Sequence, residues 1–186
     1  MRNAGNGNGQ KRWQTRFVTV VFVCYILLLL NMLFFSRITL LELFNSQRVI
    51  VRSINLIPFH SIMEFTFGSS SKVFALGNVA GNVVLFLPLG FYLLFFKEHK
   101  RAETSLLTVF LVSLCVEVIQ GLLGIGVSDV DDIILNCLGG WIGIAGYQFL
   151  TFLLRDERKL RATITVLSII GLLVILFLLF IMRMRF

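Results

Sequence analysis

Five long apolar stretches constrain the fold of this chain more than any other feature of its sequence. Four of them contain no Asp, Glu, Lys or Arg: residues 17–35, 73–96, 133–154 and 162–182. The fifth, residues 104–127, is interrupted only by Glu117. A helix needs about 20 residues to cross the hydrocarbon core of a bilayer, so each stretch is long enough to span a membrane.

The composition supports the same interpretation. Of the 186 residues, 57% are hydrophobic and only 15% are charged, and a soluble domain of this size could not bury so much apolar surface. We therefore predict an all-α fold, a polytopic membrane helix bundle with about five transmembrane helices. The expected spans are roughly 17–35, 77–96, 104–124, 133–154 and 162–182.

The sequence divides into three parts. We expect residues 1–16 to form a flexible basic tail, residues 17–154 a membrane domain, and residues 155–186 a basic loop followed by the last transmembrane helix. The connection 36–72 is too apolar for a free loop and too charged to span the membrane. Residues 40–44 favour a short amphipathic helix at the interface, so an amphipathic or re-entrant segment should follow the first span.

Pro58 determines the backbone expected for residues 55–60, because proline restricts its own φ and lacks an N–H donor. We predict an extended stretch or a turn here. Irregular backbone near a membrane needs protein or water to satisfy its polar groups, so we expect this segment to fold back over the outer mouth of the bundle. The alternative is an ordinary surface loop.

The distribution of charge predicts the orientation in the cell membrane. The net charge is +7, and bases gather in the N-terminal tail and in the short loops 97–103 and 155–161. These segments fall on one side if all five helices cross, whereas the loop around Asp129 contains no base and falls on the other. The positive-inside rule predicts a multi-pass protein with a cytoplasmic N-terminus and an extracytoplasmic acidic motif.

Six bases on the outer side oppose this orientation: Arg37, Arg48, Arg52, Lys72, Arg183 and Arg185. We give the short loops more weight, because long loops translocate with little regard to charge. The basic excess also indicates contact with anionic lipid. The sequence contains no recognisable nucleic-acid-binding module, so nucleic acid is not an expected partner.

Polar residues within the spans share helix faces with glycines. Helical spacing gives three groups: Asn78 and Asn82 with Gly77 and Gly81; Ser113, Glu117 and Gln120 with Gly121 and Gly124; Asp132 and Asn136 with Gly139 and Gly143. Glycines permit close helix approach and polar groups avoid lipid, so we predict that the three faces meet around a ligand pocket. Its candidate residues are Asn78, Asn82, Glu117, Gln120, Asp129, Asp131, Asp132, Asn136 and His60.

The acidic motif at residues 128–136 is a candidate functional site, because ionisable groups beside a bilayer are costly unless they are paired or hydrated. Ser128 and Asp131 have the spacing of a helix-capping pair, and Asp129 is the alternative cap. We assign the capping role chiefly to Asp129 and Asp131, and we place Asp132 in the pocket.

Glu117 has no capping role. It is either neutral and hydrogen-bonded or it meets a cation, with Arg37 and Arg52 as candidate partners. His60 is a candidate base, a ligand or a surface residue. No cofactor is identified, and the three cysteines have no metal-binding spacing. A divalent cation, if bound, would take oxygen ligands from Glu117, Asp129 and Asp132.

Four motifs together resemble those of the VanZ-like family of membrane proteins. They are Asn-Leu-Ile-Pro-Phe at 55–59, Gly-Asn-Val-Val-Leu-Phe-Leu-Pro-Leu-Gly-Phe at 81–91, Glu-Val-Ile-Gln at 117–120, and the acidic motif with its following glycines at 129–140. The resemblance covers roughly residues 55–150, with the motifs in the same order. Many relatives carry an Arg shortly before the acidic motif, where this chain has Val127 and Ser128.

The family is named for a protein that gives low-level resistance to the glycopeptide teicoplanin. The resemblance implies a membrane protein that contributes to such resistance or to envelope homeostasis. We expect it to act without catalysis, binding an amphipathic or lipid-linked ligand at the outer leaflet. Expected partners are membrane lipids, a lipid-linked cell-wall precursor or a lipoglycopeptide, and a homo-oligomer is compatible with the sequence.

Two other functions stay open. An intramembrane metal-dependent enzyme could act on a lipid-linked substrate, with the acids as metal ligands or Glu117 as a general acid. The sequence has no HExxH motif and no convincing nucleophile motif to support it. A small proton- or cation-coupled transporter could use acids in adjacent spans as a relay, although no inverted repeat is visible.

Overall fold

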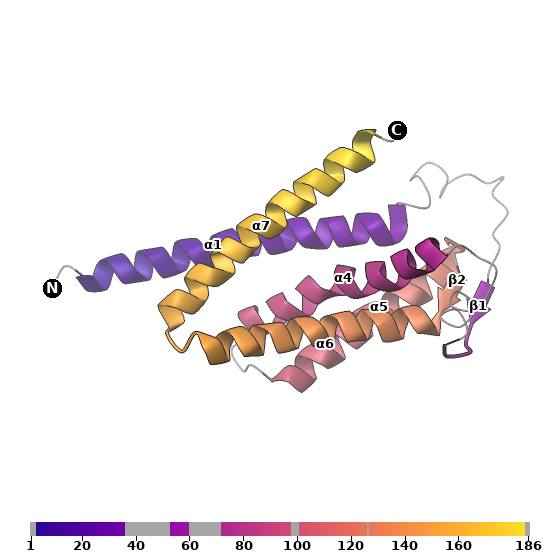
Figure 1. Ribbon diagram of the computed structural model, residues 1–186, viewed down its shortest axis with the longest axis horizontal. Coiled ribbons are helices and arrows are strands. Elements are labelled where there is room, and N and C mark those ends of the chain that lie inside the picture. The colour runs from indigo at the N-terminus through magenta and orange to yellow at the C-terminus, as the bar shows by residue number, and fades with distance from the viewer. Residues whose placement is uncertain (1–2, 36–52, 60–71, 98–100, 126, 185–186) are drawn as a thin grey trace. The chain divides into compact units, whose positions relative to one another are not determined.

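The structure is a computed structural model that describes residues 3–35, 53–59, 72–97, 101–125 and 127–184. Its elements, in chain order, are helix α1 (Asn3–Leu30), the π-helical turn η1 (Asn31–Phe35), strand β1 (Ser53–Asn55), helix α4 (Lys72–Phe96), helix α5 (Ala102–Leu123), strand β2 (Val127–Asp129), helix α6 (Val130–Leu153) and helix α7 (Glu157–Met184) (Figure 1). The predicted amphipathic helix at 40–44 lies outside the described residues.

The predicted fold class is confirmed. Five helices of the described chain are long and apolar enough to cross a membrane, and they correspond to the five predicted spans. The chain is therefore a multi-pass membrane protein. Pro88 lies inside α4. A membrane helix tolerates an internal proline when neighbouring groups satisfy the carbonyl oxygen that loses its N–H partner.

The chain packs as two compact units. We call residues 1–32 with 150–186 the terminal unit, and residues 33–149 the central unit. In the terminal unit, α1 and α7 pack against each other (Figure 1). The domain bounds expected from the sequence stay a prediction, because packing units need not coincide with domains.

Helix α1 begins at Asn3, so it continues into the segment that the sequence predicts to be a flexible tail. Lys11 Nζ lies 3.2 Å from Glu157 Oε2 at the start of α7, and Gln14 is buried. The composition of the predicted tail favours disorder, but the tail is helical from Asn3, and its residues near position 11 contact α7.

The three helices of the central unit approach closely through glycines of α6. A Cβ built on Gly143 would lie 2.0 Å from the carbonyl oxygen of Leu87 on α4, and one on Gly139 would lie 2.1 Å from that of Val83. A Cβ on Gly140 would lie 2.6 Å from a methyl group of Val109 on α5. The predicted glycine face of α6 is therefore where α4 and α6 meet.

The glycine pair of α4 behaves differently from the prediction. A Cβ on Gly77 or Gly81 would meet nothing within 4 Å among the described residues, so these glycines permit no close approach there. The close approach on α4 uses Gly90 instead, where a Cβ would lie 2.0 Å from the carbonyl oxygen of Gly140. Gly124 also has a different role, because it ends α5 in the left-handed conformation with φ of 57°.

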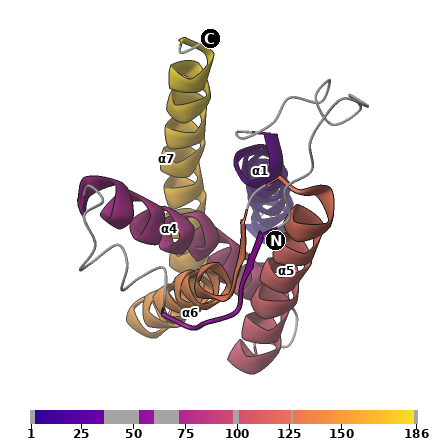
Figure 2. The ribbon, with the colours of Figure 1, turned by 90° about the vertical axis from the view of Figure 1, so that its right-hand side faces the viewer.

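Two short strands lie at one end of the central unit, where α5 ends and α6 begins (Figure 2). Strands β1 and β2 pair in parallel, with Ser53 opposite Val127 and Asn55 opposite Asp129. The sequence predicts an extended stretch or a turn from residue 55, and both are present: β1 ends at Asn55 and a turn follows at 57–59. The pairing with β2 was not predicted, because strands of three residues are too short to show a periodicity.

Candidate functional site

The site is built around the first turn of α6. This helix begins at Val130, so Asp129 occupies the N-cap position and its Oδ1 accepts a hydrogen bond from the N–H of Asp131 at 3.0 Å. The alternative cap in the sequence prediction is therefore the cap in the structure. The pairing of Ser128 with Asp131 was wrong, because the helix starts one residue later than that arrangement requires.

Asp131 has a different role. Its side chain is buried, with 1% exposure, and its Oδ1 accepts a hydrogen bond from the backbone N–H of Phe59. Phe59 has a left-handed backbone with φ of 64°, which is unfavourable for a residue with a side chain. A charge-assisted hydrogen bond to Asp131 helps to hold this backbone in place.

Asn55 ties the same segment to the acidic motif. Its Nδ2 lies 3.4 Å from both carboxylate oxygens of Asp129, and its Oδ1 accepts the N–H of Ile57 at 3.3 Å. We call residues 56–59 the apolar turn, because Leu56, Ile57 and Phe59 expose large apolar side chains. These contacts hold residues 55–59 against the acidic end of the bundle, as expected of a segment that folds back over its mouth. That this mouth faces the outer side stays a prediction.

Glu117 is buried within α5, with 3% exposure. Its Oε2 accepts a hydrogen bond from the N–H of Asp129 at 2.9 Å, so the carboxylate lies at the N-terminal end of α6. The helix dipole and the unpaired N–H groups of a helix N-terminus stabilise a negative charge at this position. The two arginines predicted as partners, Arg37 and Arg52, lie outside the described residues.

Two hydrogen-bonded side-chain pairs join α4, α5 and α6 within the first two turns of α6. Asn82 of α4 donates to Asp132 of α6 at 2.6 Å, and Asn136 of α6 donates through Nδ2 to Ser113 of α5 at 2.9 Å. The predicted meeting of the three polar faces is therefore present. Ser113 was placed on a polar face but was missed as a site residue; its position four residues before Glu117 was the available signal.

Asn136 retains one unused acceptor. The residue is 1% exposed, and its Oδ1 has no hydrogen-bond partner among the described residues. An unsatisfied buried carbonyl is costly, so this oxygen favours the entry of a hydrogen-bond donor such as water, a hydroxyl or an amide.

Three candidates remain: Gln120, Asn78 and His60. Gln120 donates to the carbonyl oxygen of Leu33 in η1 at 2.8 Å, so it satisfies a carbonyl of the π-helical turn. Asn78 lies one turn before Asn82 on α4, and His60 lies outside the described residues. No group of three or more His, Cys, Asp or Glu among the described residues could hold a metal ion.

Comparison with known proteins gives one family. The family model for VanZ/LLP1 matches residues 22–155. The chain is also 30% identical to "Protein VanZ" of Enterococcus faecium over 145 residues, which cover 77% of this chain and 80% of that protein. No solved structure matches. The segment matched by the family model includes all the described residues of the site.

Proposed function

Because this chain belongs to the VanZ/LLP1 family, whose link is to glycopeptide resistance, we propose that it lowers susceptibility to teicoplanin-like antibiotics by binding an amphipathic ligand at the membrane surface. The ligand would be the lipoglycopeptide itself or a lipid-linked cell-wall precursor. The protein binds it without changing it covalently. Family membership supports the resistance context, and the binding mode is inferred from the site.

One observation carries this proposal: exposed apolar side chains lie next to partly buried polar groups of the acidic motif, of which Asp131 is fully buried. The apolar turn is bonded through Phe59 to Asp131 and through Asn55 to Asp129. Asp132, the next residue of α6, forms a separate pair with Asn82 of α4. An amphipathic ligand needs an apolar surface and a set of polar groups within its own length. Its acyl chain would contact the apolar turn, and its polar part would form hydrogen bonds with the acidic motif.

The first test is antibiotic susceptibility. Expression of the chain in a glycopeptide-susceptible Gram-positive host should raise the minimal inhibitory concentration of teicoplanin. Asp132→Asn and Glu117→Gln keep the side-chain shape but remove the negative charge, so each should return susceptibility to the level of cells with empty vector. For teicoplanin without its acyl chain, the minimal inhibitory concentration should differ less between cells that express the wild type and cells with empty vector. This derivative lacks the apolar part that would contact the apolar turn.

Asp156→Asn is the matched control. Asp156 is an exposed carboxylate whose Oδ1 accepts the N–H of Arg158 at the start of α7, outside the site. This variant should retain resistance, with equal membrane levels of all variants checked by immunoblot. If Asp132→Asn and Glu117→Gln both keep full resistance and binding of teicoplanin by the purified protein, the assignment of this site is wrong.

We further propose that the N-terminus is cytoplasmic and that the apolar turn is extracytoplasmic, as the bases of the short loops favour. In a background with Ser at all three cysteines, Phe59→Cys should react with a membrane-impermeant maleimide added to intact cells. Arg101→Cys, in the loop before α5, should react only after the membrane is permeabilised. The reverse pattern would mean that the orientation is inverted.

The metal-dependent enzyme and the cation-coupled transporter stay predictions of the sequence. No described contact singles out either of them. The same Glu117→Gln variant would test the transporter, because a relay through Glu117 predicts that flux in liposomes is lost.

A further inference from the structure

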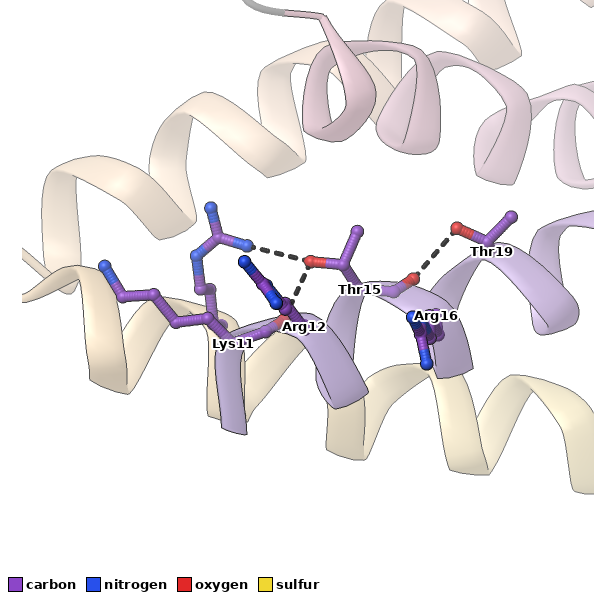
Figure 3. Close-up of a pocket in the computed structure, with 6 residues that line it drawn as sticks. Lys11, Arg12, Thr15, Arg16 and Thr19 are labelled. Atoms are coloured by element: carbon purple, nitrogen blue, oxygen red, sulfur yellow. Dashed lines mark hydrogen bonds between the residues drawn. The ribbon is translucent and has the colours of Figure 1, made fainter. Parts of the chain in front are cut away.

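A second candidate site lies in the terminal unit. Its residues are distant from the acidic motif in the sequence, and its charged side chains are basic instead of acidic. An open groove of about 390 Å³ is lined by residues of α1 and one residue of α7. The lining residues are Lys11, Arg12, Thr15, Arg16, Thr19 and Arg161 (Figure 3). Four of these six side chains are cationic, and none is acidic.

Nearby carboxylate neutralises only part of this charge. Glu157 pairs with Lys11 at 3.2 Å and with Arg161 at 3.1 Å. Arg12 and Arg16 are exposed, and neither forms an ion pair with a described residue. The groove therefore keeps an excess of positive charge that an anion would balance.

The hydrogen bonds of the groove fix the position of Arg161. Its Nη1 donates to Thr15 Oγ1 at 3.2 Å, and the Thr15 hydroxyl donates to the carbonyl oxygen of Lys11 at 3.0 Å. Figure 3 shows these bonds together with the bond from Thr19 to the carbonyl of Thr15. A guanidinium held in place loses less conformational entropy when it binds an anion, and its planar fork matches the oxygens of a phosphate.

Neighbouring aromatic residues indicate the depth of the groove in the membrane. Trp13, with 61% exposure, stacks on Phe17 at a centroid distance of 5.7 Å, and the uncharged stretch of the first span begins at Phe17. Tryptophan and basic side chains together are typical of the boundary between headgroups and hydrocarbon. A groove at this boundary would lie at the level at which lipid phosphates occur.

We propose that this groove binds a phosphate group, and that the headgroup of an anionic membrane phospholipid supplies it. Arg12 and Arg16 provide the charge. Arg161, held by Glu157 and Thr15, provides a positioned guanidinium. The bound lipid would hold the α1–α7 pair at the interface. This site is independent of the function proposed for the acidic motif, since it shares no residue with it.

Trp13 offers a local probe. In a Trp141→Phe background, Trp13 is the single tryptophan of the chain. The full-length protein would be reconstituted in mixed bilayers in which either phosphatidylglycerol or phosphatidylcholine carries brominated acyl chains that quench tryptophan. Brominated phosphatidylglycerol should be preferred next to Trp13 by about five-fold or more, since each base near an anionic surface contributes about 1 kcal/mol, a factor of about five. Arg12→Gln with Arg16→Gln should abolish the preference.

A charge-matched control removes two exposed bases elsewhere, with Arg101→Gln and Arg155→Gln. This variant should keep the preference. A second arm adds inorganic phosphate at constant ionic strength; displacement of the brominated lipid would show that the groove holds the lipid through its phosphate group, whereas phosphate binding without any lipid preference would overturn the lipid as the source. The proposal is overturned if the control variant loses as much preference as the Arg12 and Arg16 variant. It is equally overturned if neither lipid selectivity nor phosphate displacement depends on Arg12 and Arg16.

Discussion

Gly143→Ala is expected to destabilise the purified protein by about 3 kcal/mol, near the upper end of typical costs for adding a methyl group to a close-packed interior. The added Cβ would lie 2.0 Å from the carbonyl oxygen of Leu87 and 2.9 Å from the backbone nitrogen of Phe91. Both clashing atoms belong to the backbone of α4, so no side-chain rotation can relieve the contact. Helices α4 and α6 would have to separate, which also pulls Asp132 away from Asn82.

The matched control is Gly146→Ala, on the same helix. A Cβ at Gly146 meets nothing within 4 Å among the described residues, and alanine favours a helix over glycine by roughly 0.5–1 kcal/mol. This variant should therefore equal or slightly exceed the wild type in stability. Thermal unfolding in one detergent, followed by size-exclusion chromatography, measures both variants. Equal melting temperatures for the two would contradict the close packing of α4 on α6.

Asp131→Ala is expected to release the apolar turn. The substitution removes the carboxylate that accepts the Phe59 N–H and leaves that backbone in a left-handed conformation with less support. Loss of a hydrogen bond to a charged group costs about 2 kcal/mol. Local opening should then be roughly thirty-fold more frequent. Hydrogen exchange measured by mass spectrometry on a peptide that covers residues 56–59 should be faster by the same factor as local opening.

Asp131→Asn separates the hydrogen bond from the charge. An asparagine keeps a carbonyl oxygen at the same place and can still accept the N–H of Phe59, so its effect should be several-fold smaller. Exchange of a peptide from the middle of α5 serves as the internal reference, because this substitution leaves it unchanged. Exchange at the apolar turn that stays at the wild-type rate in Asp131→Ala would show that Asp131 does not hold the turn.

The acidic motif shows where the sequence prediction succeeded and where it failed. It placed Asp132 on the face that meets α4, and the bond to Asn82 agrees. It gave Asp131 chiefly a capping role, whereas Asp131 is the buried acid that holds the apolar turn. The helix starts one residue later than the proposed capping pair requires, so Asp131 is not at the third helical position, and its carboxylate bonds to the Phe59 N–H instead.

The glycines show the same limit. Two pairs with the same spacing, Gly77 with Gly81 and Gly139 with Gly143, predict close helix approach equally well. Only the second pair lies against another backbone among the described residues. The spacing defines a smooth face on one helix, but the approach also depends on whether a second helix lies opposite that face.

The sequence by itself determined the five membrane helices and the polar faces, because hydrophobic length and helical period are local properties of a continuous segment. Tertiary structure alone decided which acid is buried, that β1 pairs with β2, and that α1 and α7 form a basic groove. Each of these depends on two segments far apart in the chain that meet in one register. Helical periodicity places a residue on a face, and only packing between elements decides what that face contacts.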